Sequence, residues 1–336
     1  MKNKCLKTVL AVAMAGAVLF TGCGINKNAT LVNIDKGKDT ISMGYGNFYA
    51  RFTQSMYDGM YSGYIGDEMW SQKQGDQTME ELVKENILTS MEEGYVLQKH
   101  AEEYDVKLSD KEKKAITKAA KKFIKNNEKD TLKEMGATQE YVEQYLTEQT
   151  IVKKMEAVIK AIAKVSVSDE DAAQKAISYV KFSTADTKDS SGKTVEVTKE
   201  QKKEMKAQAK SLAGAENFDE AAQAAGVEVK TTTYGKDDSS LDEAVTKAAD
   251  ALEVGQVSDV IAVKNVGYYV VRLDSQYDEK ATAEKKASLE EEQRSKAYNK
   301  QVESWKKKIT WKVDKKQWAK VKFDTMFEAK ATEENK

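Results

Sequence analysis

The chain has 336 residues, which is enough for two domains and a connecting tether. Its 54 lysines and arginines nearly balance 55 aspartates and glutamates, and the formal net charge of −1 argues against nucleic acid as a partner. One histidine and two cysteines argue against a zinc site or Cys–His catalysis. We therefore expect no metal and no cofactor.

The N-terminus has the pattern of a secretion signal. Three lysines precede an apolar stretch, Val9 to Phe20, that is too short to span a membrane as a mature helix. The stretch ends in Leu19-Phe20-Thr21-Gly22-Cys23, which resembles the lipobox of bacterial lipoproteins. The resemblance implies that residues 1–22 are removed, that Cys23 is acylated, and that the protein is held on the extracytoplasmic face of the cell membrane. An ordinary signal peptide is the alternative.

Residues 23–40 are polar and small, and they predict a tether. An aromatic and methionine-rich run follows, in which Phe48, Phe52 and Met56 recur with helical spacing. A buried helix face is one interpretation. The other is an adaptable apolar surface for unfolded polypeptides, because methionine and tyrosine suit varied partners. The candidate client-binding residues are Phe48, Phe52, Met56 and Tyr57.

Three further helices are predicted before residue 166. The first carries an apolar stripe from Met79 to Met91 and continues to about Tyr104. Ser109-Asp110-Lys111-Glu112 is a capping box, so the second helix is expected to start there. Thr138 is expected to cap a long third helix, and Gly136 to stop the helix before it.

Two joints in this region resemble the N-terminal chaperone region of SurA- and PrsA-type foldases. One is Val106-Lys107-Leu108-Ser109-Asp110-Lys111-Glu112, which is similar to the family's "v-x-v-s-d-x-e" joint. The other is Gly136-Ala137-Thr138-Gln139-Glu140, which matches its "G-x-T-x-E" helix start. The resemblance implies that residues 41–166 form part of a helical chaperone domain for unfolded or newly secreted polypeptides.

A second domain is predicted over residues 167–275, and Val167-Ser168-Asp169-Glu170-Asp171 opens it with another cap signature. Its predicted elements are a strand, three helices and a closing strand: 177–183, 199–212, 217–222, 241–252 and 267–273. Within them the motifs "F-x-E-A-A", "L-x-x-G-x-V-S" and "G-Y-x-V-V-x-L" resemble those of the parvulin family of peptidyl-prolyl isomerases.

The parvulin resemblance implies two active-site histidines and an apolar pocket for the prolyl ring. The histidine positions fall on Tyr179 and Tyr269, and the pocket positions on Leu241 and the small Val245. Catalysis must lower an amide barrier of ~18–20 kcal/mol by gripping and desolvating the prolyl amide. Tyrosine can donate a hydrogen bond but does not titrate near neutrality. We expect isomerase activity to be lost or strongly attenuated, with an active isomerase as the alternative.

The C-terminal part begins with a charged helix from about Thr282 to Lys308. An apolar-alternating segment, Ile309 to Val313, and a short helix, Lys315 to Val321, follow it. In PrsA-type foldases this part folds back on the N-terminal helices. The resemblance therefore implies that residues 276–325 complete the chaperone domain, with residues 326–336 as a tail. Its many lysines indicate a solvated face, or else a surface for anionic lipid or cell-wall polymer.

The predicted fold class is α+β. A mostly helical SurA/PrsA-like chaperone domain is formed by the N- and C-terminal segments, with an inserted parvulin-like domain of a small antiparallel sheet plus helices. The predicted function is that of a membrane-tethered foldase. A solute-binding lipoprotein is a third hypothesis, but residues 41–166 show almost no strand signal for an α/β lobe. The sequence leaves open whether the chain forms a homodimer.

Overall fold

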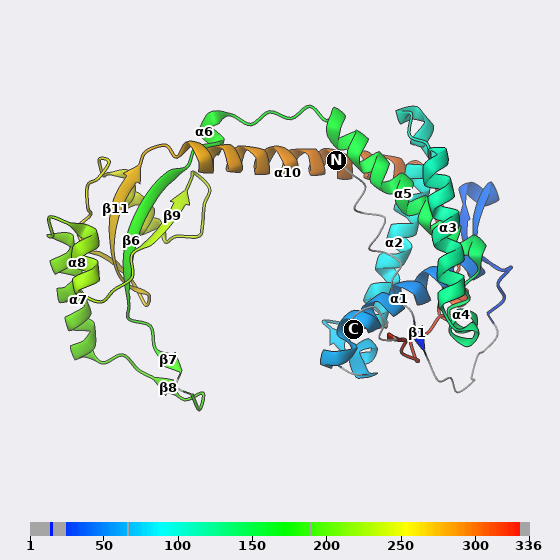
Figure 1. Ribbon diagram of the computed structural model, residues 1–336, viewed down its shortest axis with the longest axis horizontal. Coiled ribbons are helices and arrows are strands. Elements are labelled where there is room, and N and C mark those ends of the chain that lie inside the picture. The colour runs from blue at the N-terminus through cyan, green and yellow to red at the C-terminus, as the bar shows by residue number, and fades with distance from the viewer. Residues whose placement is uncertain (1–13, 16–24, 66, 189, 330–336) are drawn as a thin grey trace. The chain divides into compact units, whose positions relative to one another are not determined.

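The computed structural model describes residues 14–15, 25–65, 67–188 and 190–329. Cys23 and nearly all of the expected signal peptide, residues 1–22, lie outside them. The chain divides into two compact units, Met1–Ala163 with Lys296–Lys336 (unit 1) and Lys164–Ser295 (unit 2), and their elements are labelled in Figure 1. No described helix combines the length and apolar character that crossing a membrane requires.

Unit 1 is mostly helical. Its α-helices are α1 (Met43–Ile65), α2 (Met79–Lys99), α3 (Asp110–Asn126), α4 (Lys129–Met135), α5 (Gln139–Ile162) and α11 (Lys315–Trp318), and α10 (Glu279–Lys306) enters it from unit 2. Short 3-10 helices cover Asp35–Gly37, Asp67–Ser71 and Ala101–Tyr104. The strands are β1 (Met14–Ala15), β2 (Thr30–Ile34), β3 (Asp39–Ser42), β4 (Lys73–Gln74), β5 (Gln77–Thr78), β12 (Trp311–Val313) and β13 (Glu328–Ala329).

Side-chain caps fix the starts of the long helices, as the sequence predicts. The hydroxyl of Ser109 accepts a hydrogen bond from the amide of Glu112, whose carboxylate accepts one from the Ser109 amide, so the predicted capping box is confirmed. Thr138 caps α5 in the same way, through the amide of Tyr141. Gly136 ends α4 with φ 68°, a conformation that favours glycine.

The core of unit 1 is built by segments far apart in the chain. Residues of α1, α2, α3 and α5 pack in one apolar cluster with four residues near the C-terminus, Trp318, Val321, Phe323 and Phe327. The C-terminal segment therefore lies on the N-terminal helices. A second cluster joins α2 and α5 to the end of α10, through residues such as Leu97, Met155 and Trp305.

The structure corrects the expectation that residues 23–40 are a tether. Its described part contains β2 and the beginning of β3, which form a three-stranded antiparallel sheet with β12 in the order β12-β2-β3. Leu31, Val32 and Ile34 are completely buried. The segment is short and flanked by polar residues, and its partner Trp311 lies at the other end of the sequence, so local patterning does not reveal the strand.

Unit 2 is built on an antiparallel sheet of four strands in the order β10-β11-β6-β9. These strands are β6 (Lys175–Ser183), β9 (Lys230–Tyr234), β10 (Ile261–Val263) and β11 (Gly267–Ser275), beside a small hairpin of β7 (Thr187–Lys188) and β8 (Thr194–Val195). The helices are α6 (Asp169–Ala172), α7 (Lys199–Ala213), α8 (Phe218–Ala224) and α9 (Glu243–Asp250). Helices with small antiparallel sheets confirm the predicted α+β class.

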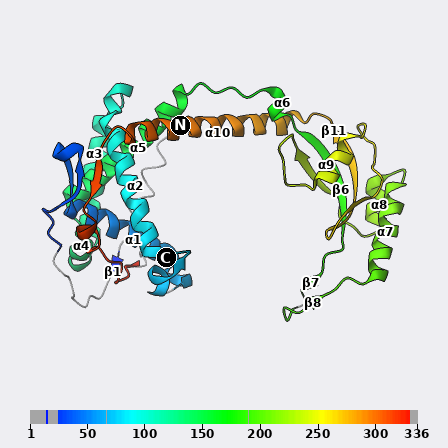
Figure 2. The ribbon, with the colours of Figure 1, turned by 180° about the vertical axis from the view of Figure 1, so that it is seen from behind.

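Each face of this sheet has its own helical cover. On β6 and β11, Val180, Phe182 and Val270 pack with α7 and α8. The alternate residues Ile177, Val271 and Leu273 pack with α9 on the other face. Successive side chains of a strand point to opposite faces, so the sheet forms the middle layer between α9 and the α7–α8 pair (Figure 2).

Candidate functional site

The two tyrosines at the expected histidine positions lie together on one face of the sheet in unit 2. Tyr179 on β6 pairs with Val271, and Tyr269 on β11 pairs with Lys181, which makes the two tyrosines diagonal neighbours. Their ring centroids are 6.0 Å apart with an interplanar angle of 36°. Leu241 and Val245 belong to the same apolar cluster, so the structure brings together all four residues that the sequence singled out.

Burial limits what these four residues can offer to a substrate. Val245 is completely buried and Tyr269 is 7% exposed, because α9 covers this face of the sheet. Tyr179 and Leu241 are half-buried. A prolyl ring needs an accessible apolar surface on which to dock. Val245 thus acts as a core residue on the face of α9 that packs against the sheet, and only Tyr179 and Leu241 present part of their side chains.

The chemistry available at the tyrosine pair is hydrogen bonding and ring contact. The Nζ atom of Lys181 lies 5.6 Å from the centroid of the Tyr269 ring, within the range of a cation–π interaction. Tyrosine hydroxyls can donate to a carbonyl oxygen. Among the described residues, no group of three or more histidine, cysteine, aspartate and glutamate side chains is placed to hold a metal ion.

A charged network that the sequence reasoning missed fixes α8 against β11. The Arg272 guanidinium donates to Asp219 at 2.6 Å and to Asp274 at 2.7 Å, and its Cζ lies 5.3 Å from the centre of the Phe218 ring. The hydrogen bond to Asp219 is the main reason that the pKa of Arg272 is raised above its ordinary value. An arginine within an apolar strand is the sequence signal that would have drawn attention to this network.

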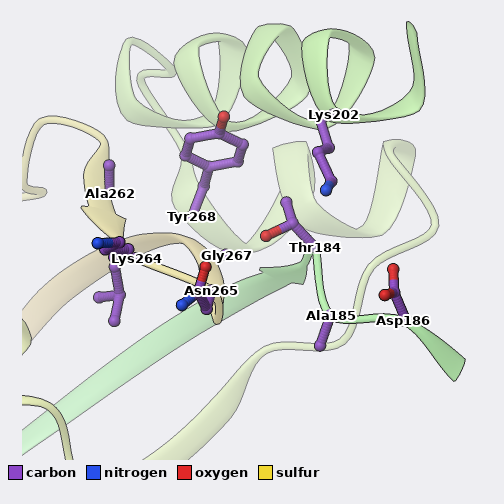
Figure 3. Close-up of a pocket in the computed structure, with 10 residues that line it drawn as sticks. Thr184, Ala185, Asp186, Lys202, Ala262, Lys264, Asn265, Gly267 and Tyr268 are labelled. Carbon is purple, nitrogen blue, oxygen red and sulfur yellow. The ribbon is translucent and has the colours of Figure 1, made fainter. Parts of the chain in front are cut away.

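A cavity of about 590 Å³ lies on the other side of the same sheet from the tyrosine pair. Figure 3 shows Tyr268 beneath α7, which carries Lys202, with Lys264 and Asn265 in the turn between β10 and β11. These side chains are exposed or half-buried. Tyr268 and Tyr269 alternate along the strand, so the cavity and the tyrosine pair are separate features.

In unit 1, the aromatic run of α1 divides into a buried and an exposed part. Phe48 and Phe52 lie in the core with ring centroids 5.7 Å apart, and neither is more than 5% exposed. They are unavailable to a client in this structure, which corresponds to the buried-face interpretation. Met56 and Tyr57 remain half-buried.

The exposed part continues beyond the residues that the sequence reasoning selected. Met60 is 65% exposed and Tyr61 is 37% exposed. The ring centroid of Tyr61 lies 6.1 Å from that of Tyr57, which in turn lies 5.8 Å from Trp70. We call Met56, Tyr57, Met60 and Tyr61 the α1 patch. The spacing of Phe52, Met56 and Met60 was the available signal, but it does not tell where the core ends.

Comparison with known proteins gives a consistent result. The model of the PPIC-type PPIase domain matches residues 179–287. The foldase protein PrsA of Clostridium botulinum strain Okra / Type B1 is 28% identical over 274 residues, covering 72% of this chain and 76% of that protein. The PrsA of strain Loch Maree / Type A3 is 28% identical over 277 residues, covering 75% and 79%.

Solved structures of PrsA are also similar to this chain. The foldase PrsA from Lactococcus lactis has 15% identity and a TM-score of 0.35, with coverage of 88% of this chain and 98% of that one. PrsA from Bacillus cereus has 20% identity and a TM-score of 0.31, with coverage of 74% and 93%. The matched domain and the sequence relatives confirm the predicted resemblance to PrsA-type foldases with a parvulin-type domain.

Proposed function

We propose that this chain is a PrsA-type foldase that is anchored through a lipid on Cys23 to the extracytoplasmic face of the cell membrane. It captures unfolded, newly secreted polypeptides with unit 1, while its parvulin-type domain has little or no isomerase activity. The observation that carries the capture role is the α1 patch, because a protein exposes large apolar side chains side by side where it binds partners.

Capture is tested by aggregation of a chemically unfolded client at stoichiometric foldase. Met60→Asp and Tyr61→Asp should abolish the delay of aggregation, because each places a charge in the α1 patch without touching the core. Ile162→Asp is the matched control, since Ile162 is 62% exposed but lies at the end of α5. If Met60→Asp and Tyr61→Asp protect the client as well as Ile162→Asp and the unchanged protein do, the α1 patch is not the capture surface.

The attenuated isomerase is argued from the replacement of both histidines by Tyr179 and Tyr269 and from the burial of Val245. A protease-coupled assay on Xaa-Pro peptides should show no turnover above that of a variant carrying Leu241→Asp. Val254→Asp is the control in the same unit, because Val254 is 60% exposed. Turnover that Leu241→Asp abolishes and Val254→Asp preserves would establish an active isomerase instead.

The lipobox-like motif at Leu19–Cys23 is the only support for the lipid anchor. Intact cells should retain the unchanged protein in the membrane fraction and release the Cys23→Ser variant in soluble form. Mass spectrometry of the N-terminal peptide should show a diacylglycerol on Cys23. A peptide that begins elsewhere and carries no lipid would contradict the anchor and leave the capture role standing.

A further inference from the structure

The residues after α11 form an extended strap, Val321 to Phe327, that lies on α1 and α2. Three of its four apolar side chains are buried: Val321 completely, and Phe323 and Phe327 with 3% exposure each, while Met326 is half-buried. Lys322 and Asp324 between them are exposed. The strap therefore alternates inward and outward side chains over its first part, as a bound peptide in extended conformation does.

The helices recognise the main chain of the strap. Three side chains donate hydrogen bonds to its carbonyl oxygens: Lys84 to Val321 at 2.5 Å, Arg51 to Lys322 at 2.5 Å, and Gln54 to Thr325 at 2.8 Å. Two carboxylates accept hydrogen bonds from its amides: Glu80 from Phe323 at 3.2 Å, and Asp58 from Phe327 at 2.9 Å. Contacts to main-chain atoms do not depend on the sequence of the segment that is bound.

The side chains that hold the strap are themselves buried. Gln54 and Asp58 are completely buried, Arg51 is 4% exposed and Lys84 is 8% exposed. Burial lowers the pKa of Arg51 and of Lys84 and raises the pKa of Asp58. Polar groups that are buried in this way need hydrogen-bond partners, and the strap supplies one to each. An empty groove would therefore favour any extended segment that offers main-chain atoms at the same places.

We call the surface of α1 and α2 that the strap covers the strap groove, and Trp70 connects it with the α1 patch. The ring of Trp70 packs on Phe323 with centroids 4.7 Å apart, and its Nε1 donates to Asp58 at 2.8 Å. The same ring lies 5.8 Å from the ring of Tyr57 in the α1 patch. A polypeptide on the patch is thus one aromatic ring away from the strap.

We propose that the strap groove of α1 and α2 is a binding site for an extended polypeptide with apolar side chains at positions i, i+2 and i+6, and that the strap fills it until such a client displaces it. The occupant is defined by the strap itself, which shows the main-chain contacts and the three apolar positions. This inference rests on the proposed capture role, for which it supplies the site and the class of client.

The first test uses the full chain and a fluorescein-labelled peptide that copies residues 319–329. The double variant Phe323→Ala/Phe327→Ala weakens the strap and leaves the groove unchanged, so it should bind this peptide about ten-fold more tightly than the unchanged protein does. Lys320→Ala is the control, because Lys320 is exposed and precedes the strap, and it should not alter the affinity. Serine in place of Val321, Phe323 and Phe327 in the peptide should abolish binding. Equal or weaker binding by the double variant would overturn the inference.

The second test needs no variant. Hydrogen exchange of the unchanged protein is measured with saturating unfolded α-lactalbumin, reduced and carboxymethylated. The amides of Phe323 and Phe327 should exchange faster when the client is bound, while that of Met155 in α5 should not change. Client binding with both strap amides still protected would remove this inference and keep the capture role, whereas no client binding would remove both. A stable dimer in which straps are exchanged would assign the groove to a second copy and overturn the client assignment.

Discussion

Replacing Glu148 by glutamine should remove one component of the pH dependence of unfolding. Glu148 on α5 is 5% exposed, and its Oε2 accepts a hydrogen bond from the Tyr45 hydroxyl at 3.0 Å. Its Oε1 has no hydrogen-bond partner among the described residues. That oxygen lies against Gly94 of α2, where a Cβ atom would collide with it. A lone carboxylate in this position is costly, so the neutral acid is favoured.

The magnitude follows from the shift in pKa. Burial raises the pKa of Glu148 from 4.5 to about 7, against the opposing effect of the Tyr45 hydrogen bond. The folded protein then binds more protons than the unfolded chain between these two values, so stability falls as the pH rises through this window. At about 1.4 kcal/mol per pKa unit, the whole effect is on the order of 3 kcal/mol. This loss of stability is complete above about pH 7 and absent below about pH 4.

Urea unfolding at several pH values between about 5 and 8 measures this effect. All four tryptophans, at positions 70, 305, 311 and 318, belong to unit 1, so their fluorescence reports the unit that contains Glu148. Glu148→Gln should flatten the pH dependence relative to the unchanged protein, whatever constant cost the amide introduces. Glu140→Gln, an exposed position on the same helix, should leave it unchanged. Parallel pH curves for the unchanged protein and Glu148→Gln would refute the reasoning.

Two further predictions concern unit 2. Gly267→Ala should lower the free energy of unfolding, measured by calorimetry, by on the order of 2 kcal/mol or more. Gly267 has φ 144°, and a Cβ atom there would collide with the carbonyl oxygen of Phe182. Gly214→Ala is the control and should cost far less. Arg272→Met should cost about 1–3 kcal/mol in chemical unfolding, because it removes two ion pairs of a partly buried guanidinium. Lys247→Met breaks an exposed pair within one helix and should leave the free energy of unfolding nearly unchanged.

Features that depend only on residues close together in the chain were predicted well from the sequence. The capping box at Ser109, the cap at Thr138 and the stop at Gly136 depend on hydrogen bonds within a few residues, so the pattern carries the whole signal. The strand of residues 177–183 is observed as Lys175–Ser183. The predicted helix from Met79 to Tyr104 breaks at His100 instead, and a short 3-10 helix completes it.

Features that depend on distant partners or on burial were not predictable in the same way. β2 forms because β12 lies beside it, and no local pattern links Ile34 to Trp311. The structure places Val245 in one cluster with Tyr179 and Tyr269, but it is completely buried, and a resemblance to a family gives position and not exposure. Likewise the spacing of Phe48 and Met60 on one helix does not show that the first is buried and the second exposed.

The pairing of β12 with β2 also determines the order in which the two units can be completed. A chain is synthesised from its N-terminus, and domains generally fold as they become available. Unit 2 is one continuous stretch, Lys164–Ser295, so all of its strands exist before Trp311 has been made. Unit 1 must wait, with Leu31, Val32 and Ile34 lacking one neighbouring strand, until the last part of the chain arrives. The unit that is proposed to hold unfolded polypeptides is therefore itself the last part of this protein to finish folding.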